Sequence, residues 1–178
     1  MTRIVAGSAR GRRLAVPDGL GTRPTSEKVR AAVFNLLGQF FEGGAVLDLY
    51  AGSGALALEA LSRGCERATC VEADRRAAEL LRRNAEGLGW GDRVEVRVGR
   101  VEALAPRLAP GYALVFVDPP YAEGPAAALA LLPPLLAPGA RVVAEHDERQ
   151  PPPDSIGPLR LLDRRRYGST GISIYGLA

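Results

Sequence analysis

From residue 45 to residue 144 the chain alternates between short apolar runs and longer segments with helical spacing, and this alternation limits the possible folds most strongly. The expected strands cover residues 45–50, 68–72, 94–98, 113–117 and 141–144. The expected helices cover residues 55–63, 75–88, 101–108 and 126–136, the last one kinked or ended by Pro133-Pro134. Alternating strands and helices form right-handed βαβ units and a parallel sheet. The pattern therefore predicts an α/β fold that binds ligands beyond the carboxyl ends of its strands.

Two segments of different character flank this alternating region. Residues 1–21 are rich in Gly and Arg and predict an irregular arm or hairpin. Thr25 and Ser26 are good helix starters, and a helix is expected from there to Leu37. After the proline-rich residues 150–157, residues 159–162 and 172–175 resemble a closing antiparallel pair of strands. We expect a single globular domain overall, with a basic arm at residues 1–22 in front of a main domain at residues 23–178.

Composition excludes several classes of protein. The chain has 178 residues and 47% apolar residues, which suits one globular domain. Its longest apolar runs are too short to span a bilayer, and the first residues lack the apolar region of a signal peptide. We therefore expect a cytoplasmic protein. Without a secretion signal, a disulfide between Cys65 and Cys70 is not expected. Two cysteines and one histidine also argue against a dedicated zinc site.

A glycine-containing turn predicts a nucleotide-like cofactor. Gly52 and Gly54 lie between the first strand and its helix, where they permit a tight turn and a close ligand. Asp48 precedes them; its carboxylate would repel a pyrophosphate and attract the ammonium group of S-adenosylmethionine. Glu72 ends the next strand, where an acidic side chain bonds ribose hydroxyls. The residues assigned to this cofactor, with adenine beside the third strand, are Asp48, Ala51, Gly52, Ser53, Gly54, Glu72, Ala73, Arg100, Val101 and Asp118.

The most specific passage is Asp118-Pro119-Pro120-Tyr121, which we call the Asp118 loop, at the end of a buried strand. Proline fixes φ, so the loop presents its acceptors rigidly. An exocyclic amine of a base is a poor nucleophile because its lone pair is delocalised into the ring. Acceptance of its N–H groups by Asp118 Oδ and the Pro119 carbonyl favours a pyramidal nitrogen that attacks the sulfonium methyl. Tyr121 would stack on the extruded base.

Positive charge is concentrated near the N-terminus. Residues 1–30 contain seven Arg and Lys against two acidic residues, a net charge of +5, while the whole chain has +3. Arginine forms forked bonds to phosphate and stacks on bases. Arg10, Arg12 and Arg13 are therefore the expected RNA contacts, although genome bias or a thermophilic surface also explains an arginine-rich chain.

Four motifs in order resemble the RsmD family, bacterial enzymes that methylate guanine N2 in 16S ribosomal RNA. They are Arg10-Gly11-Arg12-Arg13-Leu14, Arg23-Pro24-Thr25-Ser26-Glu27-Lys28-Val29-Arg30, Asp48-Leu49-Tyr50-Ala51-Gly52-Ser53-Gly54-Ala55-Leu56 and the Asp118 loop. The resemblance implies a Rossmann-like, seven-stranded methyltransferase sheet with an antiparallel last strand. It implies 16S rRNA, the 30S subunit or an assembly intermediate as partner, and Arg23 and Thr25 closing over the methionine end of the cofactor.

Two departures from the family pattern affect details. Arg100 stands where relatives often carry a polar residue that contacts adenine, so contacts there are expected through the backbone. The proline-rich stretch replaces the helix usual between the fifth and sixth strands. We expect a monomer without a metal ion, since nothing in the sequence demands a dimer.

Three other functions remain open at this stage. An adenine-N6 or cytosine-N4 methyltransferase uses the same amine chemistry, although the chain is too short for a separate DNA-recognition domain. A non-catalytic RNA-binding module is disfavoured by the intact Asp118 loop and by Glu72. A nicotinamide-dependent dehydrogenase is disfavoured by Asp48 before the glycines and by the lack of a hydride-transfer site.

Overall fold

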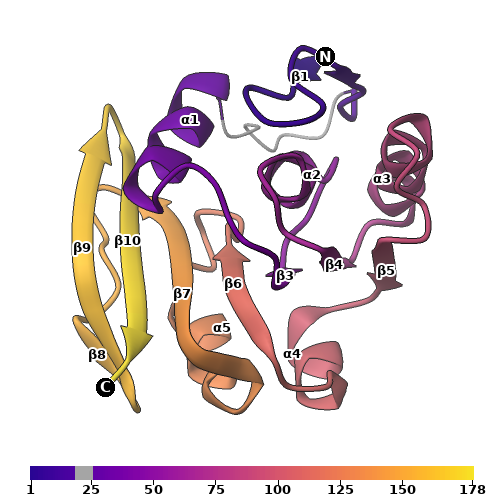
Figure 1. Cartoon of the computed structure of the whole chain (residues 1–178). Helices are drawn as coiled ribbons and strands as arrows, with labels where there is room; N and C mark the ends of the chain where they lie inside the picture. The colour runs from indigo at the N-terminus through magenta and orange to yellow at the C-terminus, as the bar shows by residue number, and fades with distance from the viewer. Residues whose placement is uncertain (19–25) are drawn as a thin grey trace.

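The computed structural model describes residues 1–18 and 26–178 and has an eight-stranded sheet at its centre (Figure 1). Its strands are β3 (Ala45–Asp48), β4 (Arg67–Glu72), β5 (Val94–Val98), β6 (Tyr112–Val117), β7 (Leu136–Asp147), β8 (Ser155–Ile156), β9 (Leu159–Tyr167) and β10 (Thr170–Leu177). They lie in the order β5-β4-β3-β6-β7-β10-β9-β8. Strands β3 to β7 are parallel, whereas β10 is antiparallel to both β7 and β9. The predicted Rossmann-like sheet with an antiparallel last strand is confirmed.

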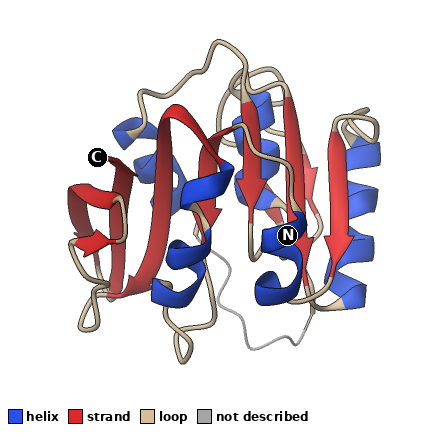
Figure 2. Ribbon diagram, turned by 90° about the horizontal axis from the view of Figure 1, so that it is seen from below, coloured by secondary structure: helices blue, strands red, loops and turns tan. Residues whose placement is uncertain are grey.

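Helices cover both faces of the sheet (Figures 1 and 2). One face carries α1 (Glu27–Leu36), α2 (Ala55–Ser62) and α3 (Arg75–Gly87); the other carries α4 (Val101–Leu104) and α5 (Ala126–Leu131). The starts of α1 and α3 follow from the sequence, because the side chains of Ser26 and Asp74 accept hydrogen bonds from the amides of Val29 and Ala77. In the described part of the chain, every helix is too short or too polar to cross a membrane.

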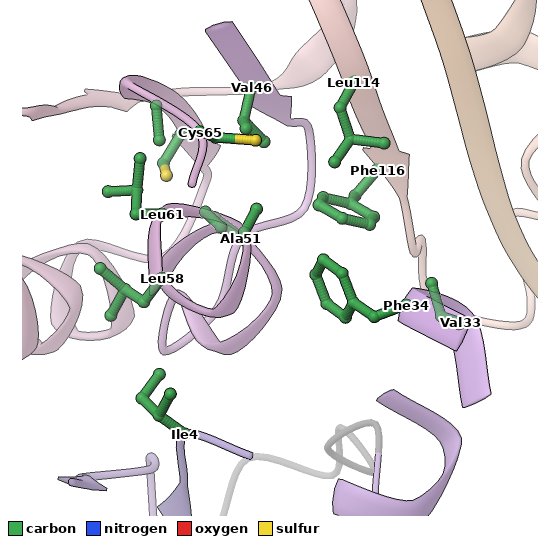
Figure 3. Packing of buried hydrophobic residues seen from close by; sticks show 14 of the residues in the cluster. Ile4, Val33, Phe34, Val46, Ala51, Leu58, Leu61, Cys65, Leu114 and Phe116 are labelled. Atoms are coloured by element: carbon green, nitrogen blue, oxygen red, sulfur yellow. The ribbon is translucent and has the colours of Figure 1, made fainter. Parts of the chain in front are cut away.

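Two apolar cores lie between the sheet and these helix layers. In the larger one, Phe34 of α1 packs against Phe116 of β6 with ring centroids 5.8 Å apart (Figure 3). The same face of the sheet buries Val143 and Ile172, from β7 and β10. Helix α1 is thereby fixed over the carboxyl-terminal halves of β6 and β7, which is where the site lies.

Within the described residues, the N-terminal segment forms a short hairpin. Strand β1 (Thr2–Arg3) pairs with β2 (Arg13–Leu14) in antiparallel register. The hairpin lies on the outer side of α2 (Figure 1). The Ser8 amide donates to the Ser62 carbonyl at 2.8 Å, and the Ser62 hydroxyl donates to the Ala6 carbonyl at 2.6 Å. The arm is therefore part of the folded structure.

A buried ionic cluster, formed by Glu59, Arg30 and Arg63 and called the Glu59 cluster below, holds the arm, α1 and α2 together. Glu59 is fully buried; its two oxygens lie 3.4 Å from Arg30 Nε and 2.8 Å from Arg63 Nε. The same oxygens accept hydrogen bonds from the amides of Val5 and Ala6 at 2.8 and 3.0 Å. One carboxylate thus neutralises two buried cations and fixes the arm backbone.

Three sequence expectations need correction. Strand β7 begins at Leu136 rather than at residue 141, because Pro138-Gly139 form an irregularity within the pairing with β6 rather than a turn. The helix expected to reach residue 136 ends at Leu131, and a short 3-10 helix follows over Pro133–Leu135, where proline lacks the amide that would extend it. The proline-rich stretch ends in the two-residue strand β8, so the sheet has eight strands rather than seven.

Candidate active site

A cavity of about 440 Å³ lies at the carboxyl ends of the parallel strands, where sheets of this type bind ligands. Its lining brings together most residues that the sequence assigns to the cofactor or to catalysis, namely Ala51, Gly52, Ser53, Glu72, Ala73, Arg100, Val101, Asp118, Pro119, Pro120 and Tyr121. Asp48 and Gly54 lie outside this lining. Arg23 and Thr25 lie outside the described residues. One continuous space therefore joins the turn at residues 51–54, called the glycine turn below, to the Asp118 loop.

The glycine turn has a geometry that only small residues tolerate. Gly54 has φ of 84°, and a Cβ there would lie 2.8 Å from Leu81 Cγ, so packing against α3 requires glycine. Gly52 has φ of 53°, and a Cβ there would meet no atom within 4 Å. The space beside Gly52 is therefore open to a ligand that approaches the backbone.

Glu72 closes the turn from the neighbouring strand. Its carboxylate accepts hydrogen bonds from the amides of Gly52 at 2.7 Å and Asp74 at 2.8 Å. Glu72 also lines the cavity, so its carboxylate is a fixed acceptor on the cavity wall with lone pairs left for a further donor. Sequence analysis missed that Glu72 stabilises the glycine turn, since this role depends on the contact between β4 and the loop after β3.

Asp48 lies at the end of β3 with 1% of its surface exposed. Neither carboxylate oxygen has a hydrogen bond of normal geometry to any residue that the structure describes. Burial, and secondly the charge of Glu72, raise the pKa of Asp48 to about 7, and the amides of Ala57 and Tyr50 oppose this shift only in part. A buried, uncompensated carboxylate beside the glycine turn fits a cofactor that carries an ammonium group.

We predict that Asp48→Asn stabilises the protein at neutral and alkaline pH. The pKa of Asp48 in the fold lies above its ordinary value of 3.8, so the free energy of unfolding falls as pH rises from about 4 to about 7 and then stays low. The neutral amide of Asn removes this loss. The free energy of unfolding should therefore rise by about 1 to 4 kcal/mol at about pH 8 and change little near pH 4. Urea unfolding at both pH values measures the difference, with the exposed Asp92→Asn as control; an equal effect at both pH values would contradict the assignment.

The Asp118 loop is held at its far end. The Pro120 carbonyl accepts a hydrogen bond from the Glu123 amide at 2.9 Å. The hydroxyl of Tyr121 shares a 3.2 Å hydrogen bond with Thr170 Oγ1 at the start of β10, while the side chain stays 41% exposed. Asp118 itself is half-buried and Pro119 is buried. The loop thus presents a carboxylate and an anchored aromatic ring on the same cavity wall.

The three arginines expected to contact RNA lie outside the cavity lining, on the surface of the hairpin. Arg10, Arg12 and Arg13 are all exposed, and Arg12 donates to the Gly87 carbonyl at 2.6 Å. The hairpin also contributes Thr2, Val16 and Pro17 to the cavity wall. The arm therefore connects a cationic surface to the site.

The lining also contains residues that the sequence did not assign to the site, among them two charged and buried side chains. Arg30, which the sequence places in a basic run, is fully buried, and Glu145 at the end of β7 is 9% exposed. The remaining conspicuous side chains are packed instead. His146 shares 2.8 Å hydrogen bonds with Ser173 Oγ and the Asp147 carbonyl, and burial lowers its pKa. Cys65 and Cys70 are free thiols in the core.

Several known proteins similar to this chain are named as methyltransferases. The Bacillus subtilis protein named "Putative rRNA methyltransferase YlbH" is 37% identical over 97% of each chain. Ribosomal RNA small subunit methyltransferase D of Escherichia coli (strain K12) is 43% identical over 68% of this chain and 61% of its own length. The solved structure titled "Putative methyltransferase yhhF from Escherichia coli" superposes with a TM-score of 0.83 at 35% identity, covering 98% of this chain and 97% of the other.

A family match extends over almost the whole chain. Residues 2–176 match the family described as "Conserved hypothetical protein 95". The match includes the hairpin, the glycine turn, the Asp118 loop and β10, so it covers every part of the candidate site. The chain therefore belongs to this family, the RsmD family of methyltransferases that its motifs resemble.

Proposed function

We propose that this protein transfers a methyl group from S-adenosylmethionine to the exocyclic N2 amine of a guanine in 16S ribosomal RNA. The observation that carries the proposal is the single cavity lined by both the glycine turn and the Asp118 loop. Two relatives named for methylation of ribosomal RNA support the substrate class. The proposal includes a monomeric, cytoplasmic enzyme that needs no metal ion, with residues 1–22 as a basic arm attached to a methyltransferase domain of residues 23–178.

The cofactor fits the residues present. Asp48 lies beside the glycine turn but outside the cavity lining, so its buried carboxylate would attract the ammonium group without direct contact, and the open space at Gly52 admits the ligand to the backbone. Glu72 supplies acceptors for the ribose, and Val101 supplies an apolar wall for the adenine ring. When bound, S-adenosylmethionine supplies an electrophilic methyl group on a sulfonium.

The chain's own contribution to the chemistry is to position and polarise the amine. Asp118 and the Pro119 carbonyl accept the two N–H groups, which localises the nitrogen lone pair toward the methyl. Tyr121, anchored through Thr170, stacks on the base and holds it in line. The N–C bond forms as the S–C bond breaks, and the proton then leaves the nitrogen for Asp118 or water. The nitrogen becomes acidic only after the transfer, so a strong base is not required to take its proton.

Methyl transfer to defined acceptors tests the proposal. Tritiated S-adenosylmethionine is incubated with 30S subunits, naked 16S RNA and duplex DNA, and the labelled nucleosides are then separated. We expect N2-methylguanosine from one of the RNA substrates. If label appears only in N6-methyladenine or N4-methylcytosine, the acceptor is adenine or cytosine rather than guanine. Tight cofactor binding without any label would favour a binding module.

The exposed arginines of the arm give a separate prediction about RNA affinity. Replacement of Arg10, Arg12 and Arg13 by Ala should weaken RNA binding and reduce the slope of log K against log salt by about two to three. Binding measured over a range of salt concentrations gives the slope. The matched control replaces three exposed arginines of β9, Arg160, Arg165 and Arg166. If both triple variants change the slope equally, the arm has no special part in RNA binding.

A further inference from the structure

Two carboxylates near the carboxyl ends of neighbouring parallel strands line the same cavity: Asp118 directly follows β6, and Glu145 lies near the end of β7. Phe116 pairs with Val143 and Val117 with Ala144 across β6 and β7. Phe116 and Val143 both point into the core under α1, whereas Val117 and Ala144 both point into the opposite core. Because side chains alternate along a strand, the next pair, Asp118 and Glu145, returns to the α1 side. Continued by one residue beyond the last pair, this register places Glu145 level with Asp118, and both residues line the cavity.

Glu145 is placed to meet a ligand and has little access to bulk water. It lines the same cavity as the Asp118 loop, and its exposed surface is 9%. Its position along the chain is fixed on both sides, because β7 pairs with β6 and also with β10, where Glu145 lies opposite Ile172. A carboxylate held in this way is a preorganised acceptor for a donor group that enters the cavity.

The bases differ in the groups that flank their amines. In guanine the N2 amine stands beside N1–H, a donor. In adenine the N6 amine stands beside N1, and in cytosine the N4 amine stands beside N3, and both of these ring nitrogens are acceptors. A second carboxylate next to the amine-binding Asp118 therefore accepts a hydrogen bond from guanine but faces a lone pair in the other two bases. Sites that bond a polar group reject analogues lacking it by large factors.

We propose that Glu145 determines the specificity of the reaction by accepting a hydrogen bond from N1–H of the acceptor guanine while Asp118 holds its N2 amine. This inference rests on the proposed function and names the group that selects the base. Glu145 acts by recognition, so its removal changes which base is accepted as well as how fast the base reacts.

The test uses 2-aminopurine, which keeps the N2 amine of guanine but has an unprotonated N1. The methylated nucleotide is first mapped in 16S RNA labelled by the wild-type enzyme. RNA carrying 2-aminopurine at that position is then prepared by ligation and offered in the form, naked or assembled, that the enzyme accepts. The measured quantity is the ratio of kcat/KM for guanine to kcat/KM for 2-aminopurine. For the wild-type enzyme we expect a ratio of about 100 or more.

The variant Glu145→Gln should reduce this ratio to about 10 or less, because an amide can accept from guanine N1–H or donate to N1 of 2-aminopurine. The missing O6 of 2-aminopurine affects both enzymes equally, so the change in the ratio reports N1 alone. Glu148→Gln is the matched control: Glu148 lies just beyond β7, outside the cavity lining, and pairs with Arg166 at 3.6 Å. It should keep the wild-type ratio. Affinity for S-adenosylhomocysteine should stay within a few-fold in both variants.

Two results would overturn the inference. One is a wild-type enzyme that methylates 2-aminopurine as well as guanine, a measurement that needs no variant to fold. The other is a Glu145→Gln enzyme that keeps the wild-type ratio. Failure of the proposed function gives a different outcome, because the mapping step would then find no methyl group on guanine N2.

Discussion

Asp118→Ala should lower kcat by about 10² to 10³ while affinity for the cofactor stays within a few-fold. The carboxylate is the charged acceptor for the amine, and loss of one preorganised electrostatic partner in an active site costs about 10² to 10³ in rate. The loop itself should keep its place, since Pro119 is buried and Tyr121 remains bonded to Thr170. Single-turnover methyl transfer and a binding isotherm for S-adenosylhomocysteine measure the two quantities.

The conservative variant Asp118→Asn separates charge from geometry. Its amide oxygen still accepts one N–H, so it should retain more activity than Asp118→Ala and bind the cofactor equally well. A large loss of cofactor affinity in either variant would show that Asp118 acts mainly on the cofactor. Equal activity in the two variants would show that the acceptor oxygen is unimportant.

Glu59→Gln should lower the free energy of unfolding by about 3 to 5 kcal/mol, although Glu59 lies outside the cavity lining. The substitution leaves Arg30 and Arg63 buried without the carboxylate that lies within 3.4 and 2.8 Å of their Nε atoms. It also removes an acceptor for the amides of Val5 and Ala6. For a domain whose stability is about 5 to 15 kcal/mol, this is a large fraction. Urea unfolding gives the loss, and amide exchange at Val5 and Ala6 shows whether the arm opens first.

An exposed glutamate in α3 provides the comparison. Glu79 lies 3.5 Å from Arg82 and 3.8 Å from Arg83, but its side chain is 53% exposed. Solvent screens such pairs, so Glu79→Gln should cost less than about 1 kcal/mol. If Glu59→Gln costs no more than Glu79→Gln, the Glu59 cluster does not hold the arm in place.

The sequence predicted the parallel core well because each of its elements has a local signature. Strand β6 is apolar along its length, and β3 is apolar up to its last residue, Asp48. Ser26 and Asp74 mark helix starts through their own side chains. Strand β7 was predicted too short because its first part lacks a local signature of a strand. Its first part contains Pro138-Gly139, and only pairing with β6 makes an extended conformation favourable there. The local sequence pattern around Pro138-Gly139 does not reveal this pairing.

The same distinction applies to the site. Residues of the glycine turn and the Asp118 loop were predicted because their motifs are contiguous in the chain, and the cavity brings most of them together. Arg30 and Glu145 were missed because their positions depend on how α1 packs on the sheet and on the register between β6 and β7. Glu59 was missed because a glutamate in a helix resembles a surface residue until its partners are known.

The position of β10 has a consequence for the order in which the protein matures. Residues 170–177 form an interior strand, paired with β7 on one edge and β9 on the other. Until these residues leave the ribosome during synthesis, β7 is an edge strand with unpaired backbone groups, and Tyr121 lacks Thr170. The nascent chain can therefore form the contact between Gly52 and Glu72, at the carboxyl ends of β3 and β4, before the hydroxyl of Tyr121 gains its partner on β10.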